Sequence, residues 1–103
     1  MITTVPRRKI EVLIDAPLLP RLMAIASGVG IGGYTLLPAL GGAGRSGRWT
    51  EDQVTGAQSK LMFMAVMSED KATALTDALG PLLESHGLLL IASTVEVVRG
   101  GKF

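Results

Sequence analysis

The 103-residue sequence contains no cysteine, and it has a single histidine, His86. The lack of cysteine excludes a disulfide framework, a thiolate nucleophile and a thiolate zinc site, and it is typical of a cytosolic protein. A lone histidine cannot form a metal-binding cluster, so we expect no metal site. We expect His86 instead to act as a cation that stabilises the C-terminal end of a helix.

Long apolar runs and strong net charge are also missing. The apolar runs of the chain, such as Leu88 to Ala92, are far shorter than the roughly 20 residues that cross a bilayer. Met1 to Lys9 carries charge but is not followed by the pattern of a secretory signal, so we expect neither export nor membrane insertion. The net charge is +1, which provides no overall field for a polyanion. Any polyanion must therefore bind at a local cluster such as Arg7 to Lys9, or Arg45 with Arg48.

Periodicity and turn residues predict six elements along the chain. Strands are expected over residues 9–14, 34–40, 59–67 and 88–98, and helices over residues 18–29 and 69–85. Their order predicts a single α+β domain over residues 1–103, a ferredoxin-like βαββαβ sandwich with a four-stranded antiparallel sheet under two helices.

The second helix carries clear signals at both ends. Ser68 is the expected N-cap, and Glu69 and Asp70 are acids in the first turn, where the helix dipole favours them. Gly80-Pro81 is expected to bend or interrupt the helix, and Gly87 to end it in the left-handed conformation.

The strand expected over residues 59–67 is apolar on both faces, with Met62, Met64 and Val66 alternating with Phe63 and Ala65. Two helices cover only one face of a sheet, so we expect a homo-oligomer to bury the other.

Nucleic acid is not an expected ligand. An RNA recognition module shares this element order but stacks bases on aromatic side chains of its middle strands. Aromatic residues make up only 4% of this chain, and the corresponding strand offers Phe63 alone.

Glu11 and Glu96 are expected to be neighbours on paired strands at a solvated or interfacial edge.

The segment Gly42-Ala43-Gly44-Arg45-Ser46-Gly47-Arg48 is rich in glycine and arginine, and residues 41–56 show no sustained apolar period. Small residues let the backbone approach a ligand closely and guanidinium groups hold negative charge, so this irregular segment predicts an anion site. A flexible, solvated connector is the alternative. Trp49 either packs onto its own domain or contacts a partner protein.

Two glycine patterns have the spacing of nucleotide-binding motifs but lack the flanking elements or residues that those motifs require. Gly28 to Gly33 fits the dinucleotide fingerprint, but it follows a helix and precedes a strand, which favours a simple helix-to-strand turn. Gly42 to Gly47 has the spacing of a Walker loop, but Arg48-Trp49 stands where lysine followed by serine or threonine is required. Neither pattern predicts a Rossmann or P-loop protein.

Several short motifs together resemble the PII signalling superfamily. They are Gly33-Tyr34-Thr35, Gly42-Ala43-Gly44-Arg45, Lys9-Ile10-Glu11 and Val95-Glu96-Val97-Val98-Arg99. They occur in the order and at the spacing of that family, over nearly the whole chain.

The resemblance implies a homotrimer that holds adenine nucleotide between neighbouring subunits and contacts a target protein through a T-loop, here about residues 45–56. It places Thr35 against the adenine, and the backbone of Gly42 to Arg45 with the arginine side chain against the phosphates. The residues it assigns to the nucleotide are Gly33, Tyr34, Thr35, Gly42, Ala43, Gly44, Arg45, Gly87, Leu88, Arg99 and Lys102.

The chain departs from the family pattern in ways that change the expected ligands. Ser46 replaces the glutamine used for magnesium and 2-oxoglutarate, the T-loop lacks its tyrosine, and the phosphate loop before the last strand is reduced to Ser85-His86-Gly87. Fewer phosphate ligands favour AMP or ADP over magnesium-bound ATP.

The chain most resembles the PII-like proteins linked to carboxysomes and bicarbonate transport. This implies bicarbonate as a second ligand, held by Arg45, Ser46 and Arg48. It also implies a bicarbonate transporter or a carboxysome component as the partner, with Trp49 as a contact.

We therefore expect a non-catalytic sensor without a cofactor or catalytic residues. The alternatives are a small ferredoxin-like oligomeric enzyme, such as an isomerase or acylphosphatase, and a purely structural trimer. An enzyme needs a general base, and the only acids near the glycine segment are Glu51 and Asp52.

Overall fold

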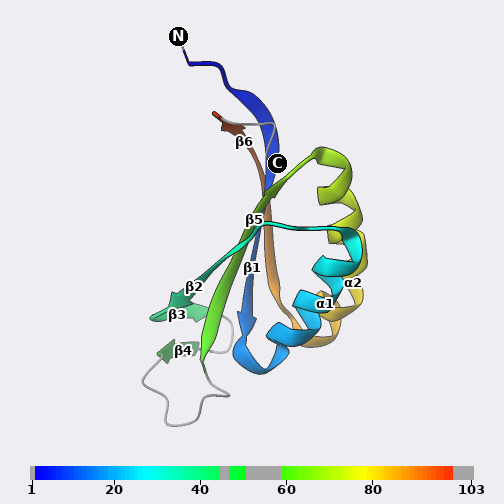
Figure 1. Ribbon diagram of the computed structural model, residues 1–103. Coiled ribbons are helices and arrows are strands. Elements are labelled where there is room, and N and C mark those ends of the chain that lie inside the picture. Colours follow the sequence, from blue (N-terminus) through cyan, green and yellow to red (C-terminus); the bar gives the residue numbers. More distant parts are fainter. Residues whose placement is uncertain (1, 45–46, 51–58, 99–103) are drawn as a thin grey trace.

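The computed structural model describes residues 2–44, 47–50 and 59–98. The elements are β1 (Val5–Asp15), a short 3-10 helix (Ala16–Leu18), α1 (Leu19–Val29), β2 (Thr35–Ala39), β3 (Gly41–Gly44), β4 (Gly47–Thr50), β5 (Lys60–Met67), α2 (Glu69–His86) and β6 (Leu89–Val97). An antiparallel sheet has the strand order β2-β5-β1-β6, and both helices cover one of its faces (Figure 1). The predicted ferredoxin-like fold is confirmed.

The core lies between the sheet and the two helices. Alternate residues of β1 and β5 point into it, and each helix adds one apolar stripe. The fully buried large side chains are Ile10, Val12, Ile14, Leu22, Phe63, Leu75 and Leu79. Burial of each contributes about 1.5 to 3 kcal/mol, which is the main force that holds the helices to the sheet.

The predicted ends of α2 are confirmed. The Ser68 side chain accepts a hydrogen bond of 3.3 Å from the backbone N–H of Lys71, and Gly87 ends the helix at φ +60°. Gly80-Pro81, however, does not interrupt the helix, which runs from Glu69 to His86 with Pro81 inside it. The buried leucines Leu79 and Leu82 flank this pair, and their packing outweighs the intrinsic cost of proline in a helix.

β1 begins at Val5, four residues earlier than predicted. Its first residues pair only with β6, with Val5 opposite Val97 and Pro6 opposite Glu96, so this end of the sheet narrows to two strands. Glu11 and Glu96 are therefore not neighbours, which corrects the sequence-based expectation. Glu11 lies opposite Ile91, and Glu96 accepts a 2.7 Å hydrogen bond from the hydroxyl of Thr4.

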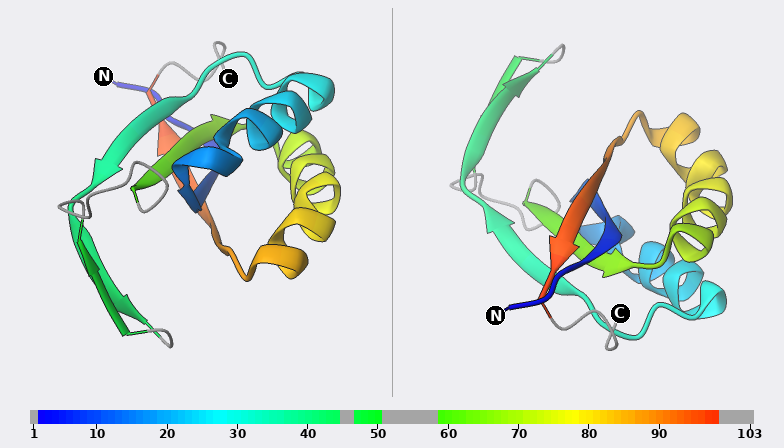
Figure 2. Two further views of the ribbon diagram at one scale, coloured as in Figure 1. Left: turned by 90° about the horizontal axis from the view of Figure 1, so that it is seen from below. Right: turned by 90° about the horizontal axis from the view of Figure 1, so that it is seen from above.

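The glycine-arginine segment was expected to be irregular, and this prediction is wrong for its described part. Gly41–Gly44 and Gly47–Thr50 pair as an antiparallel hairpin, with Gly42 opposite Trp49 and Ala43 opposite Arg48. Glycine has a low intrinsic preference for strands, so composition concealed it. Figure 2 shows the hairpin extending away from the sheet and helices.

Candidate functional site

A hollow of about 300 Å³ lies at the turn between α1 and β2. It is lined by Gly30, Ile31, Gly32, Gly33, Val66, Met67 and Lys71. Continuing the register of β2 and β5 by two residues places Gly33 beside Val66, so the end of β5 forms one wall and the glycine turn the other. The volume is at the lower end of the range for small-molecule sites.

The turn has its shape because Gly30 adopts φ +93°, the left-handed conformation that ends α1. The Gly30 N–H donates to the carbonyls of Ala26 and Ser27, and its own carbonyl accepts a 2.9 Å hydrogen bond from the Lys71 ammonium. Lys71 thus joins the first turn of α2 to the end of α1 across the hollow.

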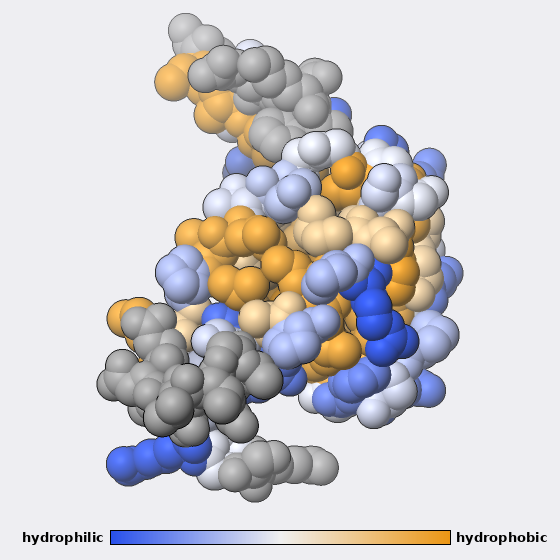
Figure 3. All heavy atoms as spheres, turned by 60° about the horizontal axis from the view of Figure 1, so that its bottom comes forward, coloured by the Kyte–Doolittle hydropathy of each residue, from blue (hydrophilic) through white to orange (hydrophobic). Residues whose placement is uncertain are grey.

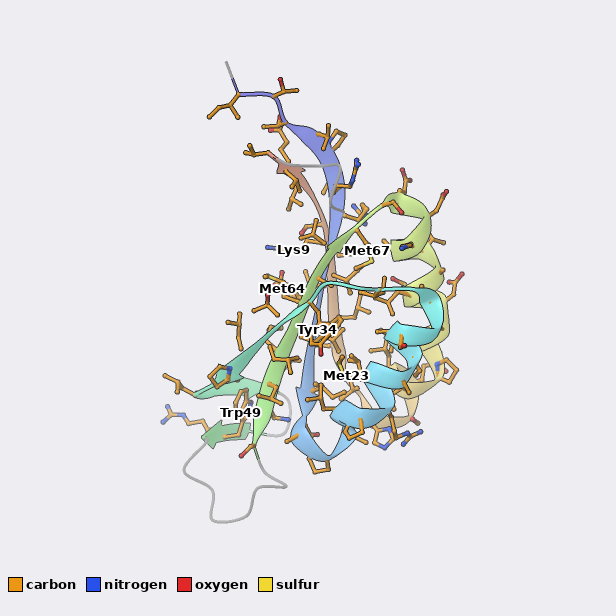
Figure 4. All side chains as sticks on the ribbon, viewed as in Figure 1. Lys9, Met23, Tyr34, Trp49, Met64 and Met67 are labelled. Atoms are coloured by element: carbon orange, nitrogen blue, oxygen red, sulfur yellow. The ribbon has the colours of Figure 1, made fainter. Side chains whose placement is uncertain are left out.

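Tyr34 and Thr35 follow the turn and point to opposite faces of the sheet. The Tyr34 ring stacks on the buried ring of Phe63, with centroids 5.7 Å apart, on the face that the helices cover. Thr35 lies opposite Met64 on the open face. Figure 4 shows Tyr34 on the helix side and Lys9 and Met64 on the other. Of these two predicted site residues, Thr35 alone presents its side chain to the open face.

The hairpin begins two residues after the end of β2. The Trp49 ring covers Gly42 so closely that a Cβ on that glycine would lie 2.8 Å from Cζ2 of the indole. The Lys60 ammonium also lies over this ring, 5.3 Å from its centroid. Trp49 is therefore packed against its own chain, which is one of the two predicted alternatives, while Arg48 is exposed on β4.

Gly87 and Leu88 connect α2 to β6 and lie at the same end of the sheet as the hairpin (Figure 1). They are nevertheless at the opposite edge, because β2 and β6 are the two outer strands. Three strand spacings, about 14 Å, separate these edges. Within one chain, the predicted site residues therefore fall into three groups: the hollow with Gly33 and Thr35, the hairpin, and the Gly87 turn.

Four residues assigned to the site by resemblance lie outside the described residues. They are Arg45, Ser46, Arg99 and Lys102. Residues 51–56 of the expected T-loop also lie outside them.

Sequence reasoning missed the walls of the hollow, Val66, Met67 and Lys71. The nearest sequence signal is the glycine pattern of residues 28–33, from which the resemblance assigns only Gly33 to the nucleotide. Another hollow, of about 400 Å³, lies between Arg8, Thr94 and the first turns of α2. It includes Arg7 and Arg8 of the expected anion cluster but none of the residues that the resemblance assigns to the nucleotide, and Arg8 donates a 2.7 Å hydrogen bond to the Thr94 hydroxyl. We therefore take the smaller hollow as the candidate site.

The face of the sheet without helices is largely apolar. Its exposed side chains include Leu37, Leu89 and Ile91, which are 45%, 53% and 43% accessible. Near its centre, Lys9 and Glu11 form an ion pair of 3.5 Å. Figure 3 shows hydrophobic side chains gathered at the surface of the molecule in this view. The expected second apolar face of the sheet is present.

In the described residues there is no cluster of acidic, histidine or cysteine side chains that could hold a metal ion. No helix among residues 2–44, 47–50 and 59–98 is long and apolar enough to span a bilayer.

Comparison with known proteins identifies the family. A sequence model of nitrogen regulatory protein P-II matches residues 7–102. No curated protein sequence matches this chain significantly. Among solved structures, the chain is similar to CPII, a nitrogen regulatory PII-like protein from Thiomonas intermedia K12 bound to ADP, AMP and bicarbonate. The TM-score is 0.90 at 22% identity, covering 100% of this chain and 98% of CPII.

A PII-like signalling protein from Thermus thermophilus is also similar, with a TM-score of 0.82 at 24% identity and 99% of both chains covered. At these identities the structural likeness supports the fold. The family match over residues 7–102, on that fold, shows that this chain belongs to the nitrogen regulatory protein P-II family.

Proposed function

We propose that the protein is a non-catalytic cytoplasmic sensor that binds ADP or AMP between the subunits of a homotrimer. The bound nucleotide changes the T-loop, about residues 45–56, and thereby the surface offered to a partner protein. The observation that carries the proposal is the placement of two complementary features on one strand. β2 has an apolar hollow at its start and leads at its end into a hairpin of small, exposed residues.

The hollow suits a nucleobase. Its lining includes the apolar residues Ile31 and Val66, with the buried Met67 behind them, and the glycine turn supplies exposed backbone groups that can fix the orientation of a flat ring. Thr35, two residues beyond Gly33, adds a hydroxyl on the open face. The hairpin suits phosphates, since Gly42 to Gly44 are all exposed and leave the backbone accessible.

The open face of the sheet supports the trimer. Leu37, Leu89 and Ile91 leave apolar area that a second copy can cover. Because the hairpin and the Gly87 turn are at opposite edges of one chain, a ligand that uses both needs a neighbouring subunit. This geometry favours sites that are completed across an interface.

Bicarbonate is the second ligand of the proposal. CPII from Thiomonas intermedia has been solved with ADP and bicarbonate, at a TM-score of 0.88 to this chain. Arg48 is exposed on β4, and Arg45 and Ser46 come between the sequences of β3 and β4. A role in inorganic-carbon metabolism, with a bicarbonate transporter or carboxysome component as the partner, follows from the resemblance.

Calorimetry tests the proposal with AMP, ADP, ATP and cyclic AMP, each with and without bicarbonate, alongside native mass measurement. We expect a trimer that binds AMP or ADP and releases them unchanged. Arg45→Ala and Arg99→Ala should weaken binding without dissociating the trimer. Turnover of the nucleotide would support an enzyme instead, and no binding of any nucleotide would leave only a structural role.

A further inference from the structure

The first turn of α2 contains a cation where the helix dipole favours anions. Lys71 is the third residue of the helix, after Glu69 and Asp70. Its side chain reaches across to the Gly30 carbonyl and lines the candidate hollow. The ammonium lies at the C-terminal end of α1, where the helix dipole favours a cation, and this position is also at the edge of the hollow.

We propose that Lys71 is a specificity-determining residue, whose ammonium donates a hydrogen bond to a ring nitrogen of the nucleobase bound in this hollow. The inference rests on the proposed nucleotide-binding function and adds to it a side chain that recognises the base through a hydrogen bond.

The Lys71 ammonium is held in position by a hydrogen bond but still has free N–H donors. It has three N–H donors, and the Gly30 carbonyl accepts one at 2.9 Å. The ion pairs of the described residues join Lys9 to Glu11 and Lys60 to Asp15, and neither involves Lys71. Two donors therefore remain to face solvent or a ligand in the hollow.

The base, not the phosphate, is the part of the ligand that fits beside Lys71. Apart from Lys71, the hollow is lined by glycines and by the apolar residues Ile31, Val66 and Met67, so no second charged side chain is present to hold a phosphate. Adenine is flat and carries ring nitrogens that accept hydrogen bonds. A charged donor at the edge of an apolar slot therefore selects a ring with an acceptor at that position.

The position of Lys71 is fixed from both sides of the hollow. The Gly30 turn is held by two backbone hydrogen bonds to the end of α1, and the Lys71 backbone N–H is bonded to the Ser68 side chain. A donor anchored in this way needs little reorganisation when a base enters, so its hydrogen bond contributes more fully to affinity.

Calorimetric titration of Lys71→Met tests the role, with Arg21→Met as the control. Arg21 is an exposed cation on α1 that does not line the hollow, so its replacement matches the change in charge. Loss of a charged donor should weaken ADP binding roughly 10- to 100-fold in Lys71→Met, and Arg21→Met should bind like the unaltered protein. Adenosine, which has no phosphate, should lose affinity by the same factor as ADP.

Nucleotide analogues separate recognition of the base from support of the turn. The 1-deaza, 3-deaza and 7-deaza forms of ADP each lack one ring nitrogen. One of them should bind the unaltered protein more weakly than ADP does, but should bind Lys71→Met as well as ADP does. If every analogue loses the same factor with both proteins, or if only ADP and not adenosine is affected by Lys71→Met, the proposal is overturned. If the unaltered protein binds no adenine nucleotide, the proposed function fails as well.

Discussion

The ammonium of Lys60, the first residue of β5, lies 2.7 Å from the carboxylate of Asp15, the last residue of β1. The same ammonium lies over the Trp49 ring, 5.3 Å from its centroid. Lys60 therefore connects the hairpin to the central sheet, at the point where the chain re-enters it after residues 51–58.

Lys60→Met should change the environment of Trp49 with little loss of stability. The ion pair is partly exposed, and each of the two contacts contributes about 1 kcal/mol or less. Trp49 is the only tryptophan, so its fluorescence reports the hairpin directly. We expect a shift of emission in Lys60→Met. Lys9→Met, which removes the ion pair with Glu11, should leave the spectrum unchanged. Identical spectra for both variants and the unaltered protein would contradict the connection.

Gly42→Ala should displace the Trp49 ring, because the added Cβ would lie 2.8 Å from the indole. Gly44 lies on the same strand, and a Cβ there meets no atom within 4 Å, so Gly44→Ala is the matched control. We expect an altered Trp49 emission only in Gly42→Ala, with a similar unfolding midpoint in both because the hairpin is outside the core. Equal emission in the two variants would mean that the ring does not rest on Gly42 in solution.

Gly30→Ala and Gly28→Ala should change stability in opposite directions. Gly30 adopts φ +93°, where alanine is strained, so the substitution should cost about 1 to 2 kcal/mol in the free energy of unfolding. Gly28 is inside α1 with open space around it, and alanine should stabilise the helix there by up to about 1 kcal/mol. Urea unfolding at one protein concentration measures both. Destabilisation by Gly28→Ala would show that the end of α1 needs that glycine.

Pro81→Ala should stabilise the protein. The proline lies inside α2, where it removes a backbone hydrogen bond. Alanine should gain about 2 kcal/mol, the difference between about 3 from helix propensity and about 1 lost from a less restricted unfolded chain. Pro20 is in the first turn of α1, where proline is tolerated, so Pro20→Ala should have a much smaller effect. Equal unfolding midpoints for Pro81→Ala and the unaltered protein would contradict this.

The sequence was sufficient for the fold because the core residues follow simple periods. Ile10, Val12 and Ile14 alternate along a strand, and Leu75, Leu79 and Leu82 repeat at helical spacing. It was insufficient for the hairpin, since glycines pair there through backbone groups that composition does not reveal. At Gly80-Pro81 the local signal predicts a bend or an interruption, but the helix continues through Pro81 because neighbouring leucines pack in the core.

The candidate site was only partly predictable because long-range packing brings one of its residues into place. Gly33 and Thr35 could be assigned from their motif, but Lys71 is 38 residues beyond Gly33 and reaches the hollow only through the packing of α2 on α1. The hydrogen bond from Lys71 to Gly30 joins residues 41 positions apart. No local sequence pattern links residues so far apart, so the structure was needed to find Lys71.

Ile91→Asp should dissociate the proposed trimer without unfolding the subunit. Ile91 is 43% exposed on the open face and lies opposite Glu11, so an aspartate there places two carboxylates side by side where a second copy must pack. In a monomer, both charges remain hydrated and cost little. Ala74→Asp, at an exposed position of α2 on the helix-covered side, is the control and should leave the assembly intact. Light scattering after gel filtration gives the mass, and circular dichroism reports whether the fold is retained. A trimer of Ile91→Asp with unchanged stability would mean that the open face is not the interface, and the apolar area on Leu37, Leu89 and Ile91 would then need another occupant.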